Sequence, residues 1–277
     1  MGQLYLVPTP IGNLEDMTFR AIRVLQSVEL IASEDTRHTG KLLQHFQITT
    51  PQISYHDHNR QSRLPQLLAH LQAGKSLALV TDAGTPGISD PGADLVQACL
   101  AQNLEVIPLP GATALIPALI ASGLTTERFV FEGFLPPKGQ ARETRLLSLR
   151  QEQRTTILYE APHRLLTTLV DLEHHLGPER AIVTARELTK LHEQFWRGNL
   201  GQALIYYQDQ EPRGEFVLVL AGVTLAEQPL LSEQQLKAEL QALIQQGLSR
   251  SQASRELAQL TQLPRRQLYQ LSLDVEA

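Results

Sequence analysis

The chain has one cysteine and one tryptophan among 277 residues, and aromatic side chains make up only 5% of it. A single cysteine excludes an internal disulfide and a thiolate metal site, and Cys99 falls in a predicted helix, where we expect a small buried side chain. No apolar run reaches the length of a membrane span, and the first ten residues lack the basic and apolar segments of a signal peptide. These absences lead us to expect a cytoplasmic globular protein.

Several familiar catalytic signatures are also missing. The nine histidines are scattered without the spacing of a metal site, and no serine lies in a nucleophile elbow. The loop at residues 7–14 contains two prolines and one glycine, which fits neither a P-loop nor a dinucleotide fingerprint. NAD and nucleoside triphosphates are therefore poor candidates for the ligand, and we expect no metal.

The net charge of −5 does not by itself indicate a nucleic-acid partner, but the basic residues are unevenly distributed. Each of two groups either contacts phosphates or forms the solvated face of a helix, and charge alone favours the second interpretation. The first group is Lys138, Arg142, Arg145, Arg150 and Arg154, and the second is Lys237, Arg250, Arg255, Arg265 and Arg266.

The hydrophobic pattern predicts an α/β protein with a small helical tail. Short apolar strands alternate with helices in residues 1–110, which indicates a parallel or mostly parallel sheet with helices on its faces. A second α/β domain is expected over residues 111–228, with strands near 129–131, 155–159, 181–185 and 216–220. Residues 229–277 have only helical patterns, and their similarity to a helix-turn-helix is weak.

The loop at residues 81–92 is the most informative segment of the chain. It follows an apolar strand and holds three glycines, two prolines and two aspartates. Glycines let a ligand approach the main chain and prolines stiffen it, and ligands of α/β proteins bind beyond the carboxyl ends of strands. Asp90 is expected to cap a helix that runs from Gly92 to about Ala101. The loops at residues 7–14 and 109–115 have the same proline–glycine character.

Polar residues follow other predicted strands. Glu34, Asp35 and Arg37 close the second strand, where Asp35 either acts as a base or caps the next helix while Arg37 pairs with an acid. Charged clusters at residues 159–164 and 186–193 follow two strands of the second domain. Charged side chains directly after buried strands point to function more strongly than charges on helix faces do.

These loops, taken in order, carry a family resemblance. The segments VPTPIGNL, EDTR, SYHDHN, TDAGTPGISDPG, PLPGATAL, GFLPPKG, YEAPHR and RELTKLHE occur as in the ribosomal RNA methyltransferase branch of the tetrapyrrole-methylase superfamily, and the match covers residues 4 to about 222. The resemblance implies two α/β domains with S-adenosyl-L-methionine in the cleft between them, and a homodimer. It also implies 2′-O-methylation of a cytidine ribose in the decoding region of 16S rRNA, within the 30S subunit.

Residues at the ends of strands are the site candidates that this resemblance and the loop positions select. The cofactor candidates are Pro10, Gly84, Thr85, Ile88, Asp90, Pro110, Gly111, Ala112, Thr113, Tyr159 and Gly222. The candidates for activating the acceptor hydroxyl are Asp35, Glu187 and Lys190, and Arg37 and Arg186 are candidate contacts to phosphate or ribose.

Two alternatives remain open: methylation of a tetrapyrrole-like small molecule, and RNA binding without catalysis. The chain departs from porphyrin-precursor methylases at Thr85, where those enzymes have an aspartate between glycine and proline, and in its opening loop, which is not glycine-dominated. The low aromatic content also argues against a flat macrocycle. An RNA-binding module would not need the three loops.

Overall fold

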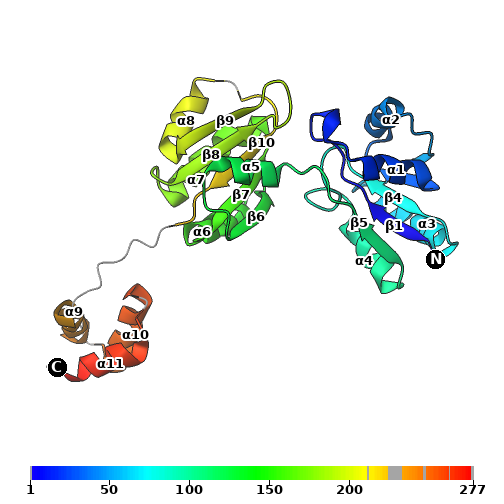
Figure 1. The fold of residues 1–277 in the computed structure, drawn as a ribbon. Coiled ribbons are helices and arrows are strands. Elements are labelled where there is room, and N and C mark those ends of the chain that lie inside the picture. Colours follow the sequence, from blue (N-terminus) through cyan, green and yellow to red (C-terminus); the bar gives the residue numbers. More distant parts are fainter. Residues whose placement is uncertain (1, 211, 224–232, 246–247, 262, 276–277) are drawn as a thin grey trace. The chain divides into compact units, whose positions relative to one another are not determined.

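The computed structural model describes residues 2–210, 212–223, 233–245, 248–261 and 263–275 (Figure 1). The chain divides into a larger unit, Met1–Val223, and a smaller one, Thr224–Ala277. The domain boundary predicted between residues 228 and 229 lies outside the described residues. None of the helices in this part of the chain combines the length and apolar character that a membrane-spanning segment needs.

The first half of the larger unit is a five-stranded sheet in the order β3-β2-β4-β1-β5, and every strand pair is parallel, as predicted. Its strands are β1 (Gln3–Leu6), β2 (Leu30–Ser33), β3 (Gln52–Ser54), β4 (Leu77–Val80) and β5 (Glu105–Pro108). Its helices are η1 (Leu14–Asp16), α1 (Phe19–Ser27), α2 (Thr36–His45), α3 (Arg60–Gln72) and α4 (Ala93–Ala101).

The central strand β4 shows why the strands of this sheet are short apolar segments in the sequence. All four of its residues are buried, because helices cover both faces of the sheet. Ala78 and Val80 pack with α1 and α2, whereas Leu77 and Leu79 pack with α3 and α4. Cys99 of α4 is fully buried in the second of these clusters, as the sequence predicted.

The start of α4 corrects one prediction. The helix begins at Ala93, and Gly92 is its N-cap, with φ of 139°. Asp90 is therefore not the cap; its carboxyl group accepts a hydrogen bond from Thr81. Only glycine fits at position 92, because a Cβ there would lie 2.7 Å from a methyl group of Leu79.

The second half of the larger unit is a mixed sheet in the order β6-β7-β10-β8-β9, in which only the β6–β7 pair is parallel. Its strands are β6 (Phe129–Phe134), β7 (Thr155–Glu160), β8 (Ala181–Arg186), β9 (Gln194–Asn199) and β10 (Phe216–Leu220). Its helices are α5 (Leu115–Ser122), α6 (Gln140–Arg150), η2 (Pro162–Arg164), α7 (Leu165–Leu176) and α8 (Leu200–Gln208). The edge strand β9 was not predicted, because its sequence QFWRGN has no apolar run.

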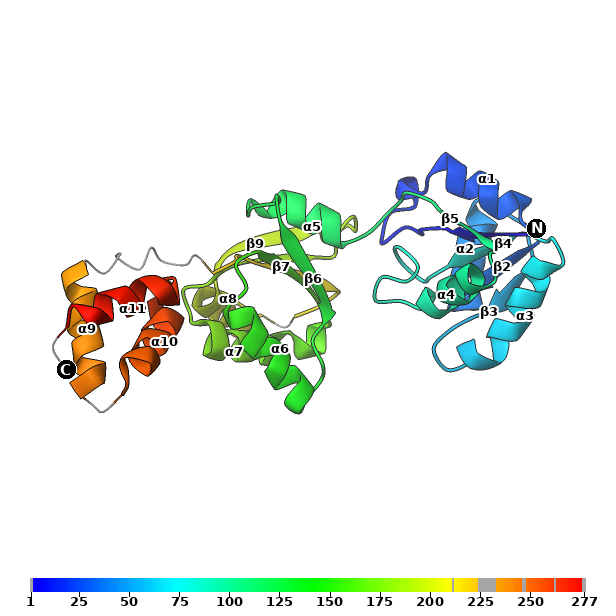
Figure 2. The same ribbon diagram turned by 90° about the horizontal axis from the view of Figure 1, so that it is seen from below.

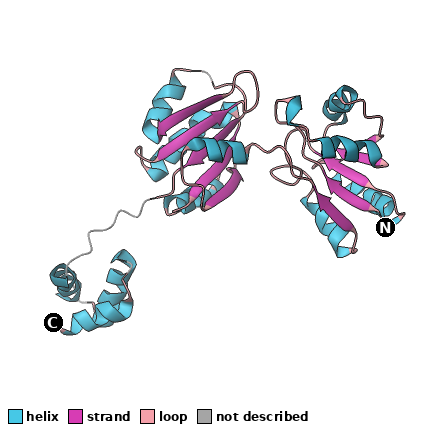
Figure 3. Cartoon of the chain, in the orientation of Figure 1, coloured by secondary structure: helices cyan, strands magenta, loops and turns pink. Residues whose placement is uncertain are grey.

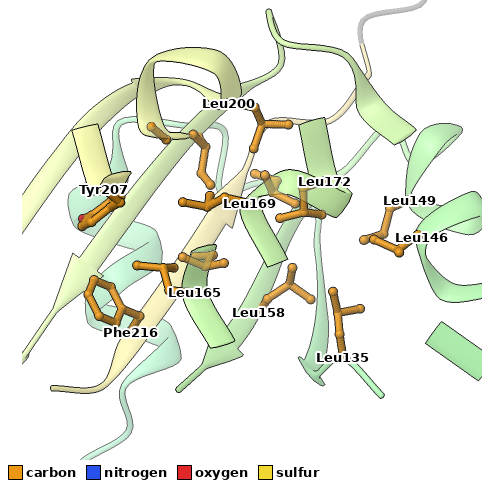
Figure 4. Packing of buried hydrophobic residues seen from close by; sticks show 14 residues of the cluster. Leu135, Leu146, Leu149, Leu158, Leu165, Leu169, Leu172, Leu200, Tyr207 and Phe216 are labelled. Atoms are coloured by element: carbon orange, nitrogen blue, oxygen red, sulfur yellow. The ribbon is translucent and has the colours of Figure 1, made fainter. Parts of the chain in front are cut away.

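Helices cover both faces of this second sheet, as Figures 2 and 3 show. The leucine-rich cluster drawn in Figure 4 joins α6, α7 and α8 to one face, with Leu158, Leu218 and Phe216 contributed by the strands. Helix α5 packs on the other face through Ala118 and Leu119. The C-cap of this helix is Gly123, whose φ of 81° is the left-handed conformation that often ends helices.

The first basic group does not form a free charged surface. Arg142 is buried, and its guanidinium bonds the carboxylate of Asp171 at 2.7 Å, the hydroxyl of Thr168 and the carbonyl of Pro136. Two more of its arginines are paired within the chain, Arg145 with Glu132 and Arg154 with Glu152. Arg142 and Arg145 therefore tie α6 to neighbouring elements, and Arg154 pairs locally with Glu152.

The smaller unit contains α9 (Glu233–Gln245), α10 (Arg250–Thr261) and α11 (Arg265–Leu273). The three helices share a core that includes Leu236, Leu240, Leu257 and Leu268. The second basic group lies here, and Lys237 is paired with Glu233 and Asp274. The helices predicted for the tail are thereby confirmed.

Candidate functional site

Hydrogen bonds and close packing join the three proline–glycine loops. Thr9 and Gly84 exchange two backbone hydrogen bonds of 2.9 Å, which link the first loop to the second. The hydroxyl of Thr85 donates to the carbonyl of Ala112 at 3.0 Å, which links the second loop to the third. A Cβ at Gly111 would lie 2.7 Å from the ring of Pro8, so the third loop also packs closely on the first. The three loops therefore form one assembly beyond the carboxyl ends of β1, β4 and β5.

A cavity of about 490 Å³ opens beside this assembly, within the larger unit. Its size is typical of a small-molecule site. Six of the predicted cofactor residues line it, namely Gly84, Thr85, Ile88, Asp90, Thr113 and Tyr159. Segments from both sheets contribute to its wall. We call this cavity the first cavity.

The other predicted cofactor residues lie elsewhere. Pro10 lines a neighbouring cavity, and Pro110, Gly111 and Ala112 support the loop assembly without lining the first cavity. Gly222 is not brought to the cavity at all. It lies next to the carbonyl of Gln153, which precedes β7, whereas the cavity lies at the other end of that strand.

The antiparallel direction of β10 explains the position of Gly222. Gly222 follows a strand, as the other predicted site residues do, but that strand, β10, runs antiparallel to β7 and β8. The amino end of β10 is consequently the end that reaches the first cavity, and it brings Glu215, Phe216 and Val217 there. Glu215 was missed for the same reason: it could have been predicted only if β10 had been known to run antiparallel to its neighbours.

The first cavity has an acidic wall. Besides Asp90, it is lined by Glu34, Asp82, Glu160 and Glu215, while His163 is the histidine among its lining residues. Burial, and then the charge of Glu34, raises the pKa of Asp90 to about 7, with further contributions from Asp82 and Glu215. Burial also raises the pKa of Glu34. Carboxylates that repel one another in a partly dry cavity favour a cationic ligand.

Tyr159 and Glu160 form the part of the wall that comes from β7. The Tyr159 hydroxyl is hydrogen-bonded by Thr113, so it ties the third loop to the second sheet, while burial raises its pKa. Its ring makes edge contacts with Phe131 and Phe134. Glu160 is almost fully buried. Its carboxylate accepts a hydrogen bond from the hydroxyl of Thr168 and pairs with Arg164 of η2. Both residues are therefore rigidly placed.

A second cavity, of about 470 Å³, adjoins the first and shares Ile11, Asp82, Ala83 and Glu215 with it. Lys190 lines this second cavity, where its amine contacts Glu187 at 2.9 Å and Glu215 at 3.1 Å. Burial acts to lower the pKa of Lys190, but the two carboxylates outweigh it and the pKa is raised. Lys190 is thus a fixed ammonium group that can donate hydrogen bonds but is a poor base.

The remaining polar candidates lie outside both cavities. Asp35 is the N-cap of α2 and is paired with Arg37 at 2.7 Å, so of the two interpretations of Asp35 the structure shows the cap. The hydrogen bonds from Arg37 hold the pKa of Asp35 far below its usual range, which makes it a weak base. Arg186 donates to the carbonyl of Arg213 at 2.7 Å. Glu187 does not line the second cavity, but it contacts two residues that do: the amine of Lys190 at 2.9 Å and the backbone amide of Glu215, which donates to its carboxylate at 3.2 Å.

Unusual backbone conformations gather in the same region. Ser89, Glu187 and Thr189 have φ of 61°, 51° and 65°, although none of them is glycine. Ser89 lines the first cavity, and the other two lie shortly before Lys190 in the sequence. Such conformations cost free energy and occur often at binding sites, where the surrounding structure holds them.

Comparison with known proteins places this geometry in a family. The model of the family Tetrapyrrole (Corrin/Porphyrin) Methylases matches residues 3–204. A relative from Synechocystis sp., named ribosomal RNA small subunit methyltransferase I, is 67% identical over all of this chain and 99% of its own length. A relative of the same name from Escherichia coli O157:H7 is 46% identical over 99% of this chain and 95% of its own.

Solved structures share the fold. A uroporphyrin-III C-methyltransferase from Thermus thermophilus, crystallised with S-adenosylhomocysteine, superimposes with a TM-score of 0.56 at 18% identity over 79% of this chain and 97% of its own. A diphthine synthase gives a TM-score of 0.62 at 12% identity over 79% of this chain and 90% of its own. From the family model and from the identity over the whole chain, we conclude that this protein belongs to the tetrapyrrole methylase family.

Proposed function

We propose that the protein transfers a methyl group from S-adenosyl-L-methionine to ribosomal RNA of the small subunit. In its finer form, the proposal is 2′-O-methylation of a cytidine ribose in the decoding region of 16S rRNA, within the 30S particle. The names of the relatives at 67% and 46% identity support the coarser statement. The observation that carries the proposal is the first cavity, with its acidic wall beside three joined loops.

The first cavity fits S-adenosyl-L-methionine in size and in charge. The cofactor supplies a methyl group that is already activated on a sulfonium cation. Gly84, Thr85, Ile88 and Thr113 would hold it through the loops, and Asp90 would lie in the wall that faces its positive charge. The loops are stiffened by proline and by their mutual hydrogen bonds, so they can fix the orientation of the methyl group and exclude water.

The second cavity supplies the residue that we propose for activation of the acceptor. A ribose hydroxyl is a poor nucleophile at neutral pH, and a nearby cation lowers its pKa. Lys190 can act in this way, since its ammonium group is held by Glu187 and Glu215 beside the wall that the two cavities share. We therefore assign Lys190 the electrostatic role and Glu187 the positioning of Lys190. Asp35 positions the start of α2, and Arg37 and Arg186 remain candidate contacts to RNA at the surface.

The test is methyl transfer to 30S particles that lack the modification. Purified protein is incubated with methyl-labelled cofactor and the particles, and the labelled nucleotide is mapped and hydrolysed. The expected product is a ribose 2′-O-methylcytidine in the decoding region. Methyl on a base or on another ribose would overturn the finer proposal, and no transfer to RNA would overturn the coarser one.

Two controls separate the alternatives. Calorimetric titration with S-adenosyl-L-methionine should show binding, which a non-catalytic RNA-binding protein does not need. Lys190→Ala should lower methyl transfer while leaving cofactor affinity within about twofold, because Lys190 lines the second cavity and not the first. Methylation of a tetrapyrrole in preference to the particles would favour the small-molecule alternative. A homodimer in a cytoplasmic protein completes the proposal, and sedimentation tests the oligomeric state.

A further inference from the structure

The second cavity has a composition quite unlike that of the first. One wall is the first half of α2, and another is the opening loop. The cavity contains basic and apolar groups in addition to the two acids that it shares with the first cavity. The residues from α2 are His38, Thr39, Lys41 and Leu42, and the loop adds Thr9, Pro10, Ile11, Gly12 and Leu14.

Thr39 carries a polar group without a partner. The residue is only 1% exposed, and its hydroxyl has no hydrogen-bond partner among the residues that the structure describes. A buried hydroxyl that bonds nothing destabilises a fold, so the great majority of such groups are paired. Thr39 lines the second cavity, and a ligand in that cavity can provide the missing partner.

The basic side chains in and beside the second cavity differ in their availability. Lys190 is engaged by two carboxylates, and Arg37, which precedes the cavity on α2, is engaged by Asp35. Lys41 and His38 are exposed on α2, and in the described part of the chain neither makes an ion pair. A phosphate group can therefore bind them without breaking an existing pair.

We propose that the second cavity is the acceptor subsite and binds one ribonucleotide unit of RNA. The phosphate contacts Lys41 and His38, a ribose hydroxyl contacts Thr39, and the apolar face of the nucleotide lies against Leu14 and Leu42. This inference rests on the proposed function, because it places the acceptor beside the cavity that we assign to the cofactor. The charges agree with it: the acidic first cavity suits a cation, whereas the ammonium group of Lys41 in the second, which is unpaired among the described residues, suits a phosphate.

Two pairs of variants test the subsite. Thr39→Val keeps the shape of the side chain and removes the hydroxyl, while Thr39→Ser keeps the hydroxyl. Lys41→Gln removes a charge inside the cavity, and Lys75→Gln removes one from an exposed lysine that precedes β4, at the opposite end of the first sheet. Each variant is assayed for kcat and KM with unmodified 30S particles, for cofactor affinity by calorimetry, and for thermal stability.

We expect Thr39→Val and Lys41→Gln to lower kcat/KM for the particles by about tenfold, the effect of one hydrogen bond to a bound ligand. Cofactor affinity should stay within about twofold in both. Thr39→Ser, which keeps the hydroxyl, should recover most of the kcat/KM that Thr39→Val loses, and Lys75→Gln should behave like the parent. Thr39→Val should also unfold at the same temperature as the parent or higher, since it removes an unpaired buried hydroxyl. If Thr39 had only a structural role, a loss of activity would come with a loss of stability.

Three results would overturn the subsite: unchanged kcat/KM in Thr39→Val and Lys41→Gln, an equal loss in Lys75→Gln, or a loss explained by weaker cofactor binding. Failure of the proposed function has a different signature. If the parent does not methylate the particles, the same variants are compared for binding of a fluorescent oligoribonucleotide. If Lys41→Gln binds the oligoribonucleotide more weakly and Lys75→Gln does not, the subsite stands without the reaction. If the parent does not bind it, both the subsite and the proposed function are overturned.

Discussion

Asp90 provides the sharpest test of the cofactor assignment, because its charge should change near neutral pH. The pKa of its carboxyl group is about 7 in the unliganded protein, through burial and the neighbouring charges of Glu34, Asp82 and Glu215. A sulfonium cation in the first cavity favours the ionised carboxylate. Binding should therefore release a proton, and the affinity for S-adenosyl-L-methionine should rise with pH.

The size of this effect follows from the pKa. A group with a pKa of about 7 is about one-tenth ionised at pH 6 and about nine-tenths ionised at pH 8. If the cofactor binds the ionised form, its affinity should rise about tenfold over that interval. S-adenosylhomocysteine has a neutral thioether in place of the sulfonium, so its affinity should change much less. Asp90→Asn cannot ionise and should have a nearly flat profile for both ligands.

Calorimetric titrations at pH 6, 7 and 8, in two buffers of different ionisation enthalpy, measure both the affinity and the protons released. The same slope for the cofactor and for S-adenosylhomocysteine would refute the reasoning, as would a slope that persists in Asp90→Asn. The unliganded protein offers an independent check. Because the folded chain holds the Asp90 proton more tightly than the unfolded chain does, its free energy of unfolding should fall as the pH rises from about 4 to 7.

Other predictions concern stability and the tail. Gly92→Ala should lower the free energy of unfolding by about 2–4 kcal/mol, since it adds a steric overlap to the strain of positive φ. Gly74→Ala has open space around its Cβ and should lower it by about 1 kcal/mol. Urea denaturation measures both, and equal losses would contradict the steric overlap at position 92. Arg142→Ala should cost about 3 kcal/mol in the same assay, because it leaves the partly buried Asp171 without its cation, and replacement of both partners by apolar residues should cost less. A chain of residues 1–223 should fold and bind the cofactor like the parent, as it is one compact unit, and circular dichroism with calorimetry would reveal failure of either.

The first sheet could be predicted well because its signals are local. A fully buried strand such as Leu77–Val80 must be apolar throughout, and the proline and glycine of the following loop mark its end. The second sheet could be predicted only in part. Its other strands were predicted, but the polar edge strand Gln194–Asn199 has no apolar run to reveal it, and strand direction is a long-range property.

The site shows the same division between local and long-range information. Gly84, Thr85 and Asp90, which were predicted to bind the cofactor because their loop follows a parallel strand, line the first cavity. Reversal of one strand placed Glu215 in the wall and carried Gly222 to the far end of the sheet. The pairing of Asp35 with Arg37 was one of two open interpretations, since only atomic contacts decide whether a carboxylate caps a helix or faces a ligand.

The hydrogen bonds among the three proline–glycine loops have a consequence for how this protein can vary. The reciprocal bonds between Thr9 and Gly84, and the bond from Thr85 to Ala112, fix the lengths of the three loops relative to one another. An insertion in any one loop would displace its partners, so changes there should be tolerated only as coordinated sets. The amide of Asp35 at the start of α2 also bonds Asp82 of the second loop, but in the described part of the chain residues 38–42 of α2 make no hydrogen bond to the loops. Redesign of the acceptor preference should therefore begin at residues 38–42, where side chains can change without moving the loops.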